Sequence, residues 1–161
     1  VASDVDGVVT QAINIRVYDG SQATDLFISE YIEDGNNKAL EIFNGTGSAI
    51  DLGTGDYEIR GYQNGAVTVG YTVDLTGTIA DGDVWVVSHS SAAAGIQAQT
   101  DLSYDLQFNG NDAVVLTKAG SSIDVMGTIG SATTWGADVV KVRKSDVIEG
   151  VATYDPLQWD D

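Results

Sequence analysis

Apolar and polar residues alternate along much of the chain in short runs. The clearest runs lie near residues 13–17, 67–73 and 102–108. In the first run, Ile13, Ile15 and Val17 share one side of an extended backbone and leave polar residues on the other. Successive side chains of a β-strand point to opposite faces of the sheet, so this period of two predicts strands with one buried face.

Asp-Gly and Asn-Gly pairs separate these runs. They occupy residues 6–7, 19–20, 34–35, 44–45, 64–65, 81–82 and 109–110. These residues tolerate the positive φ angles that tight hairpin turns require. Asn44-Gly45-Thr46 also fits the N-glycosylation pattern, and we interpret it as a turn. Turns spaced by roughly 8–12 residues predict a β-sandwich or a barrel.

The runs and turns together predict an all-β fold of about nine to eleven short strands with one short helix. The strands are expected near residues 11–18, 26–33, 39–43, 48–52, 56–62, 66–74, 83–88, 102–108, 113–118 and 122–127, with one more at 138–143. The helix is expected over residues 91–99, with Ser90 or Ser91 as its N-cap. Residues 145–161 are expected to form an irregular closing segment.

The chain divides into two parts near residue 20. Residues 1–20 contain an acidic turn followed by one predicted strand, and the polar stretch 21–24 comes next. This N-terminal segment has three interpretations: an edge strand of the same domain, the tail of a preceding domain, or an arm donated to a neighbouring molecule. Residues 21–161 are long enough to bury a core and are expected to form one β-sandwich domain.

The chain is strongly acidic. Its 24 Asp and Glu residues against 7 Lys and Arg residues give a net charge of −17. Phosphate backbones and anionic lipids attract basic surfaces, so we expect no nucleic-acid binding and no attraction to such membranes. No apolar run approaches the roughly 20 residues of a membrane-spanning helix, so we expect no membrane insertion. The lack of cysteine excludes thiolate catalysis and cysteine-bound zinc. The acid-rich turns favour an extracellular, secreted protein.

Turns rich in Asp and Asn are candidate calcium sites, because calcium takes about six to eight oxygen ligands. The candidate ligands lie at alternate or adjacent positions beside glycines and are Asp4, Asp6, Asp34, Asn36, Asn109, Asn111 and Asp112. None of these turns matches an EF-hand. Asp and Asn are also ordinary turn formers, which is the alternative for each site. The high negative charge favours a bound cation, and calcium is the expected one.

Candidate catalytic residues are sparse. His89 is the only histidine, and no G-x-S-x-G motif is present, so a Ser–His–acid mechanism would rest on this one residue. Glu30, Glu33, Glu41 and Glu58 lie in or beside predicted strands, and a glycosidase would need two of them facing one cleft. We therefore expect no enzymatic activity and keep a small hydrolase as an alternative.

Several segments resemble, in order and spacing, the bacterial lamin-tail domain family. They are residues 26–33 (LFISEYIE), 36–46 (NNKALEIFNGT), 49–52 (AIDL), 75–87 (LTGTIADGDVWVV), 108–116 (FNGNDAVVL), 123–127 (IDVMG), 143–145 (RKS) and 155–159 (DPLQW). The resemblance implies an immunoglobulin-like β-sandwich without catalytic residues. It implies structural roles for Glu30, Glu41 and Asn44. In many secreted bacterial proteins such domains accompany a nuclease or phosphoesterase domain.

The leading functional hypothesis is a non-catalytic extracellular structural or interaction module. In its sharper form, the chain is a subunit of a fibre in which Ile13, Ile15 and Val17 of the N-terminal strand add to an adjacent subunit and calcium stabilises the contact. The expected partner is another copy of the chain or another extracellular protein. The first alternative is an accessory lamin-tail domain of a secreted bacterial nuclease, and the second is a small hydrolase.

Overall fold

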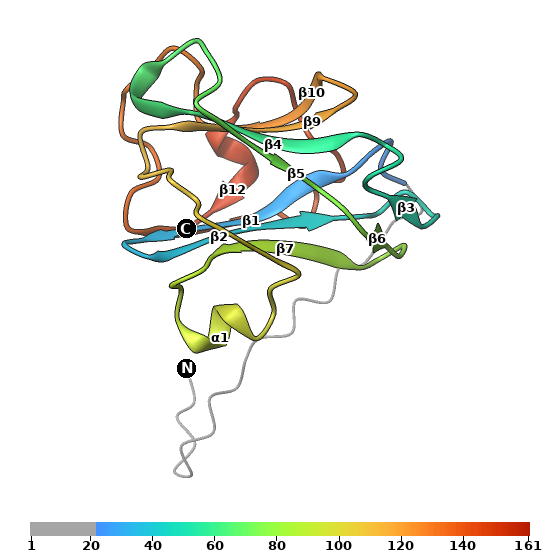
Figure 1. The fold of residues 1–161 in the computed structure, drawn as a ribbon. Coiled ribbons are helices and arrows are strands. Elements are labelled where there is room, and N and C mark those ends of the chain that lie inside the picture. The colour runs from blue at the N-terminus through green and yellow to red at the C-terminus, as the bar shows by residue number, and fades with distance from the viewer. Residues whose placement is uncertain (1–21) are drawn as a thin grey trace, which may run out of the picture.

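Two β-sheets pack face to face in the computed structural model, which describes residues 22–161 (Figure 1). The larger sheet has six strands in the order β12 (Trp159–Asp160), β11 (Val139–Arg143), β1 (Phe27–Asp34), β2 (Asn37–Phe43), β7 (Val84–His89) and β8 (Leu102–Tyr104). The smaller sheet has four strands in the order β10 (Ser121–Met126), β9 (Ala113–Lys118), β4 (Tyr57–Tyr62) and β5 (Tyr71–Asp74). This arrangement confirms the predicted immunoglobulin-like β-sandwich.

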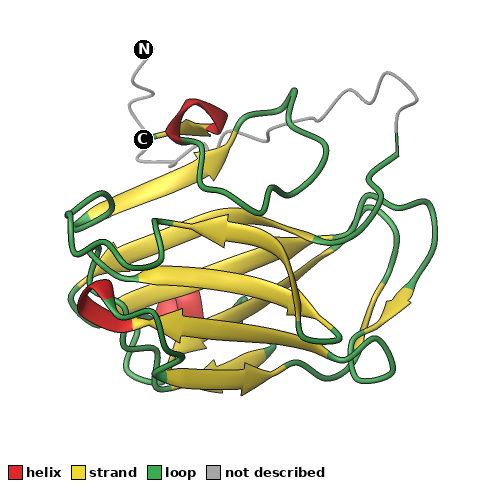
Figure 2. Cartoon of the chain, turned by 90° about the horizontal axis from the view of Figure 1, so that it is seen from above, coloured by secondary structure: helices red, strands yellow, loops and turns green. Residues whose placement is uncertain are grey.

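Short elements complete the fold. β3 (Ile50–Asp51) and β6 (Thr78–Ile79) form a two-stranded pair at one end of the sandwich. The helix α1 (Ala94–Gln97) follows β7, and single 3-10 turns occur at η1 (Gln63–Gly65) and η2 (Pro156–Gln158). Figure 2 shows how small the helical share is beside the strands. Within residues 22–161, no helix is long and apolar enough to cross a membrane.

The core lies between the two sheets. It is built from the inward-facing side chains of both sheets and of the loops that close the ends. Tyr31 of β1 lies at its centre, with its ring centroid 4.9 Å from the rings of both Phe108 and Trp135. The Tyr31 hydroxyl donates a hydrogen bond to the Gly136 carbonyl at 3.1 Å, which satisfies its polar atom inside the core.

A buried ion pair ties the closing segment to the sandwich. The Arg143 guanidinium binds the Asp124 carboxylate, and both side chains are fully buried. Arg143 also donates to the Ile28 carbonyl at 3.1 Å and packs over the Trp159 ring at 4.3 Å. Asp124 accepts the Val151 backbone N–H at 2.9 Å. These contacts hold residues 145–161 in place, where the sequence predicted only an irregular segment and the structure adds η2 and the short strand β12.

Four predicted elements are clearly longer than the observed ones. The strand predicted over 48–52 is reduced to the two residues of β3. The strand predicted over 66–74 is limited to β5, because η1 turns the chain at Asn64 (φ 52°) and Gly65 (φ 78°). The strand predicted over 102–108 ends at Tyr104, although Leu106 and Phe108 are buried in the core. The helix predicted over 91–99 has only four residues. In each case the apolar side chains are buried or the chain turns locally, but the backbone does not form the regular hydrogen bonds of the predicted element.

The predicted strand at 11–18 lies outside the described residues, as do Ile13, Ile15, Val17, Asp4 and Asp6. The division of the chain at residue 20 therefore stays a prediction.

Candidate interaction surface

The outer face of the six-stranded sheet carries apolar side chains where a water-facing sheet would carry polar ones. All four residues from Val84 to Val87 in β7 are apolar. Trp85 and Val87 point into the core, so Val84 and Val86 lie on the outer face. Val84 is 37% exposed. A strand that is apolar on both sides is typical of a sheet covered on both faces.

The same face continues across the neighbouring strands. Cross-strand partners share one face of a sheet, which places side chains of β11, β1 and β2 beside those of β7. Val140 is 46% exposed. We call this surface the outer patch, and its members are Ile32, Ala39, Val84, Val86, Val140 and Val142.

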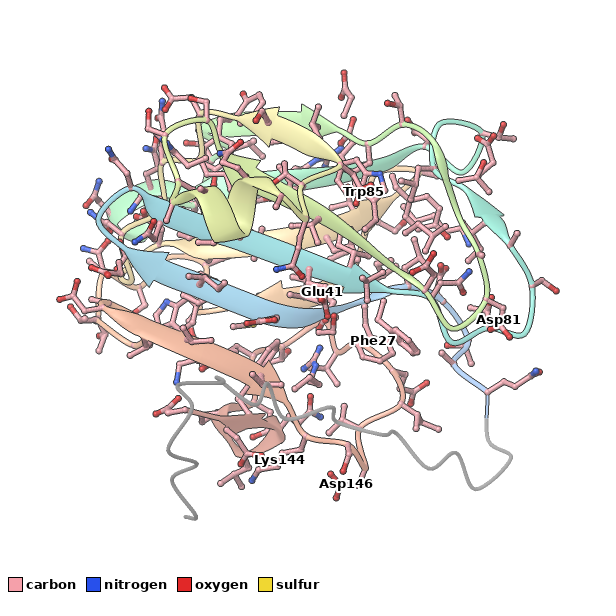
Figure 3. The ribbon with its side chains drawn as sticks, turned by 90° about the horizontal axis from the view of Figure 1, so that it is seen from below. Phe27, Glu41, Asp81, Trp85, Lys144 and Asp146 are labelled. Atoms are coloured by element: carbon pink, nitrogen blue, oxygen red, sulfur yellow. The ribbon has the colours of Figure 1, made fainter. Side chains whose placement is uncertain are left out.

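Two carboxylates lie in the middle of the outer patch. Glu30 of β1 stands directly opposite Glu41 of β2, and Figure 3 shows Glu41 on this face. The Ser29 hydroxyl donates to Glu41 Oε1 at 2.6 Å. Burial raises the pKa of the Glu30 carboxyl above its usual value, and the negative charge of Glu41 raises it further. Among the described residues, no Lys, Arg or His forms a salt bridge with either glutamate.

A shallow cavity adjoins the two glutamates. Its volume is about 150 Å³, and it is lined by Glu30, Ile32, Ala39, Glu41, Val86, Ile96 and Gln99. Ile32, Ala39 and Val86 belong to the outer patch, and Ile96 comes from α1. The lining is therefore mixed, with the Glu30 and Glu41 carboxylates beside apolar side chains.

The helix α1 lies over one end of this face, below β7 in Figure 1. Its N-cap is Ala93, without a side-chain cap, so neither Ser90 nor Ser91 caps it as predicted. The backbone N–H of Ala93 instead binds Asn37 Oδ1 at 2.9 Å. Gln97 Nε2 donates to the His89 carbonyl at 2.6 Å and fastens the helix to the end of β7.

The chain enters the described region at the other end of the face. Ala23 packs with Phe27 of β1 and Phe43 of β2 in a small buried cluster. The two phenylalanine rings meet edge to face with centroids 5.5 Å apart. The backbone N–H of Ala23 is held by the Gly45 carbonyl at 3.0 Å. The described part of the chain therefore begins beside the outer patch.

The predicted calcium ligands are not gathered by the described structure into one carboxylate cluster. Asp34, the last residue of β1, and Asn36, in the β1–β2 turn, are both exposed. Asp112 is buried, and its two oxygens accept the backbone N–H groups of Asn64 at 2.6 Å and of Asn109 at 3.0 Å. Within residues 22–161, no group of three or more His, Cys, Asp or Glu side chains is placed to hold a metal ion.

Asn109 and Asn111 lie in the same turn as Asp112. Asn109 Oδ1 accepts the Asn111 backbone N–H at 3.5 Å, and Asn111 Nδ2 reaches Asn64 Oδ1 at 3.4 Å. These contacts are those of a turn-forming loop. Calcium binding by the seven predicted ligands stays a prediction.

His89 has an acidic neighbour but lacks a nucleophile. Its Nε2 lies 2.8 Å from Asp105 Oδ1, and its Nδ1 accepts the Ser91 backbone N–H at 3.0 Å. The Ser88 hydroxyl is engaged with Thr100 Oγ1 at 2.7 Å instead. Within the described part of the chain, no serine hydroxyl is hydrogen-bonded to His89, so a Ser–His–Asp arrangement is not assembled there.

Asn44 is a structural residue of its turn. It is fully buried, and Nδ2 donates to the carbonyls of Ser48 at 2.8 Å and Ile79 at 2.9 Å. Its Oδ1 accepts the Thr46 hydroxyl at 2.8 Å. Its amide nitrogen is thus committed to the fold, in agreement with its interpretation as a turn residue.

Residues 19–130 match a family model described as Lamin Tail Domain. This range covers more than half of the 161 residues, while the closing segment lies beyond it. No curated protein and no solved structure gives a significant match. The family has an immunoglobulin-like fold, in agreement with the two packed sheets. It is a family of non-catalytic domains. The chain belongs to the lamin tail domain family.

Proposed function

We propose that this domain is a non-catalytic extracellular module that assembles with copies of itself into a fibre. The observation that carries the proposal is the apolar character of the outer patch, in which Val84 is 37% and Val140 46% exposed. Ile32, Val86 and Val142 are half-buried there, and Ala39 is buried. Contiguous exposed apolar surface on a soluble domain marks a contact site. A chain with a net charge of −17 repels its copies, so a specific apolar contact is needed to bring them together.

The N-terminal segment supplies the other half of the contact. Residues 1–20 carry Ile13, Ile15 and Val17 on one side of a predicted strand. An extended segment with alternate apolar side chains can dock on a neighbouring β-domain. When each subunit donates its segment to the next one, the contact is head-to-tail and the assembly grows as a filament.

Calcium has a supporting part in this proposal. A divalent cation held between acidic turns of adjacent subunits would reduce their repulsion. The candidate ligands for such a contact are the exposed residues Asp34 and Asn36 and, outside the described residues, Asp4 and Asp6.

The experiment compares the mass in solution of three full-length or truncated proteins by light scattering. The unaltered chain is expected to form particles of many subunits. The variant that carries Ile13→Ser, Ile15→Ser and Val17→Ser is expected to be a monomer of about 16.9 kDa. A chain that lacks residues 1–20 is expected to be a monomer of lower mass. Asn14→Ala, on the other side of the predicted strand, is the control and should keep the assembly. Unchanged mass after removal of residues 1–20 would contradict the proposal.

Membership of the lamin tail domain family favours a second candidate function, an accessory domain of a secreted nuclease. This alternative requires a catalytic domain in the same polypeptide. It also requires a monomer in solution with or without residues 1–20, so the same mass measurement separates the two functions.

A further inference from the structure

We infer that the outer patch is the acceptor surface for residues 11–18 of a second copy of the chain. This inference rests on the proposed function and names the surface that the donated segment occupies. The occupant's apolar side chains are Ile13, Ile15 and Val17. They would lie across strands β7, β2, β1 and β11, on the face that Figure 3 views from below.

The length of the donated strand matches the width of the acceptor surface. Ile13 and Val17 are four residues apart, which is about 13 Å in an extended strand. From β7 to β11 the sheet order crosses three inter-strand spacings, or about 14 Å. The register aligns Ala39, Ile32 and Val140 in one row across β2, β1 and β11. A strand laid across the sheet along this row can therefore bring its apolar side chains over these three residues.

The N-terminal segment leaves its own domain at Ala23, and this position limits how far residues 11–18 can extend toward a neighbouring copy. Ala23 is fixed beside Phe27 and Phe43, at the edge of the outer patch of the donor. The five residue steps from Tyr18 to Ala23 span at most about 18 Å. The acceptor patch of the neighbouring copy must lie within that distance of the donor's Ala23, which is compatible with direct head-to-tail contact between domains.

The outer patch differs from the other exposed apolar side chains. Val67 is 75% exposed and Leu157 is 77% exposed, but neither belongs to a regular strand face. The outer patch presents side chains at regular strand spacing on a rigid sheet. The cavity of about 150 Å³ beside Glu30 and Glu41 leaves room for water next to the two carboxylates beneath a covering strand.

The test uses two full-length variants, alone and mixed. Ile15→Glu disables the donor, and Val140→Glu disables the acceptor on a side chain that is already 46% exposed. Each variant alone is expected to be a monomer. Their mixture is expected to form a one-to-one dimer of twice 16.9 kDa and nothing larger, because one intact arm and one intact patch remain.

Two further variants make the outcome decisive. Val84→Glu places the charge at another exposed position of the patch and should behave as Val140→Glu does. Val67→Glu is the matched control at an exposed valine outside the patch, and it should leave the assembly unchanged. Circular dichroism of each variant checks that the sandwich is folded.

The possible failures are distinguishable. If Ile15→Glu prevents assembly while both patch variants still assemble, the donated arm is right and the acceptor surface is wrong. If Ile15→Glu also assembles normally, the proposed function itself fails. If the variants are monomers that yield no dimer on mixing, as when the arm folds onto the patch of its own chain, the inference is overturned.

Discussion

At the scale of single residues, the sandwich depends on a few polar side chains that are buried with their partners. Asp124 and Arg143 are the clearest case, since both are fully buried and 19 residues apart. A buried charge is tolerated only when it is paired and its remaining hydrogen-bonding sites are satisfied. The sequence contains no signal for this pair, because neither periodicity nor turn chemistry links the two positions.

Asp124→Asn should destabilise the fold strongly. The substitution leaves the Arg143 charge buried without its counter-ion, which costs about 3–5 kcal/mol in comparable cases. Urea unfolding, followed by tryptophan fluorescence, measures the change. Glu58→Gln is the control, because Glu58 forms a partly exposed pair with Arg60, and it should cost less than about 1 kcal/mol. Equal effects of the two substitutions would contradict this role of Asp124.

Glu30→Gln should change how stability depends on pH. The pKa of Glu30 is raised in the folded state, so folding binds its proton more tightly than the unfolded chain does. The native protein should therefore gain stability as the pH falls through that raised pKa and lose this gain as the pH rises above it. At neutral pH, Glu30→Gln should stabilise the fold by a few tenths to about 1 kcal/mol, because two like charges no longer face each other.

The measurement is the melting temperature of both proteins across mildly acidic to neutral pH. The difference between Glu30→Gln and the unaltered chain should be largest at neutral pH and shrink as the pH falls. Glu149→Gln, at an exposed position, controls for the change in net charge. A difference that is constant across this pH range would show that Glu30 does not titrate as described.

At the scale of elements, alternation predicted strands well wherever the run has a partner strand on at least one side. The runs at 26–33, 39–43, 56–62, 113–118 and 138–143 correspond closely to observed strands. The runs at 66–70 and 105–108 do not, since one follows a 3-10 turn and the other lies in a buried loop. Alternation in the sequence indicates which side chains are buried. It does not indicate whether the backbone of that segment forms hydrogen bonds with a neighbouring strand.

The outer patch also could be predicted only in part from the sequence. The continuous apolar run Val84–Val87 was available in the sequence as a sign of a strand covered on both faces. The opposition of Glu30 and Glu41 was not, because it depends on the register between β1 and β2 and on the bulge after Ile28. Sequence analysis therefore named both glutamates without placing them together.

The loop between β8 and β9 should be sensitive to substitution at Gly110. Gly110 has φ +85°, and a Cβ there would lie 2.2 Å from the backbone nitrogen of Ala137. Gly110→Ala should therefore destabilise the protein by more than the roughly 1 kcal/mol that a positive φ alone costs. Gly35→Ala, with φ +59° and open space around it, isolates the cost of the backbone angle. Urea unfolding of both variants should rank Gly110→Ala as the more damaging.

At the scale of the whole molecule, the fold class was predictable and the function was not. A period of two with regularly spaced turns leaves few alternatives to a β-sandwich. A sandwich supports many unrelated functions, so the fold alone does not select one. The surface that we assign to assembly depends on exposure of particular side chains, which becomes visible only when the two sheets are placed.

Calcium should raise the melting temperature if it binds the native chain. A ligand that binds only the folded state stabilises it by an amount that grows with its concentration. We expect an upward shift at millimolar calcium chloride that exceeds the shift from sodium chloride of equal ionic strength, which merely screens the net charge of −17. Equal shifts in the two salts would contradict specific calcium sites.

The central claim is that copies of this chain assemble end to end through the N-terminal arm. Electron microscopy of the full-length protein in solution tests it most directly. We expect continuous threads one domain wide, which disappear when residues 1–20 are removed. Isolated globular particles of single-chain size, under conditions where the sandwich is folded, would contradict it.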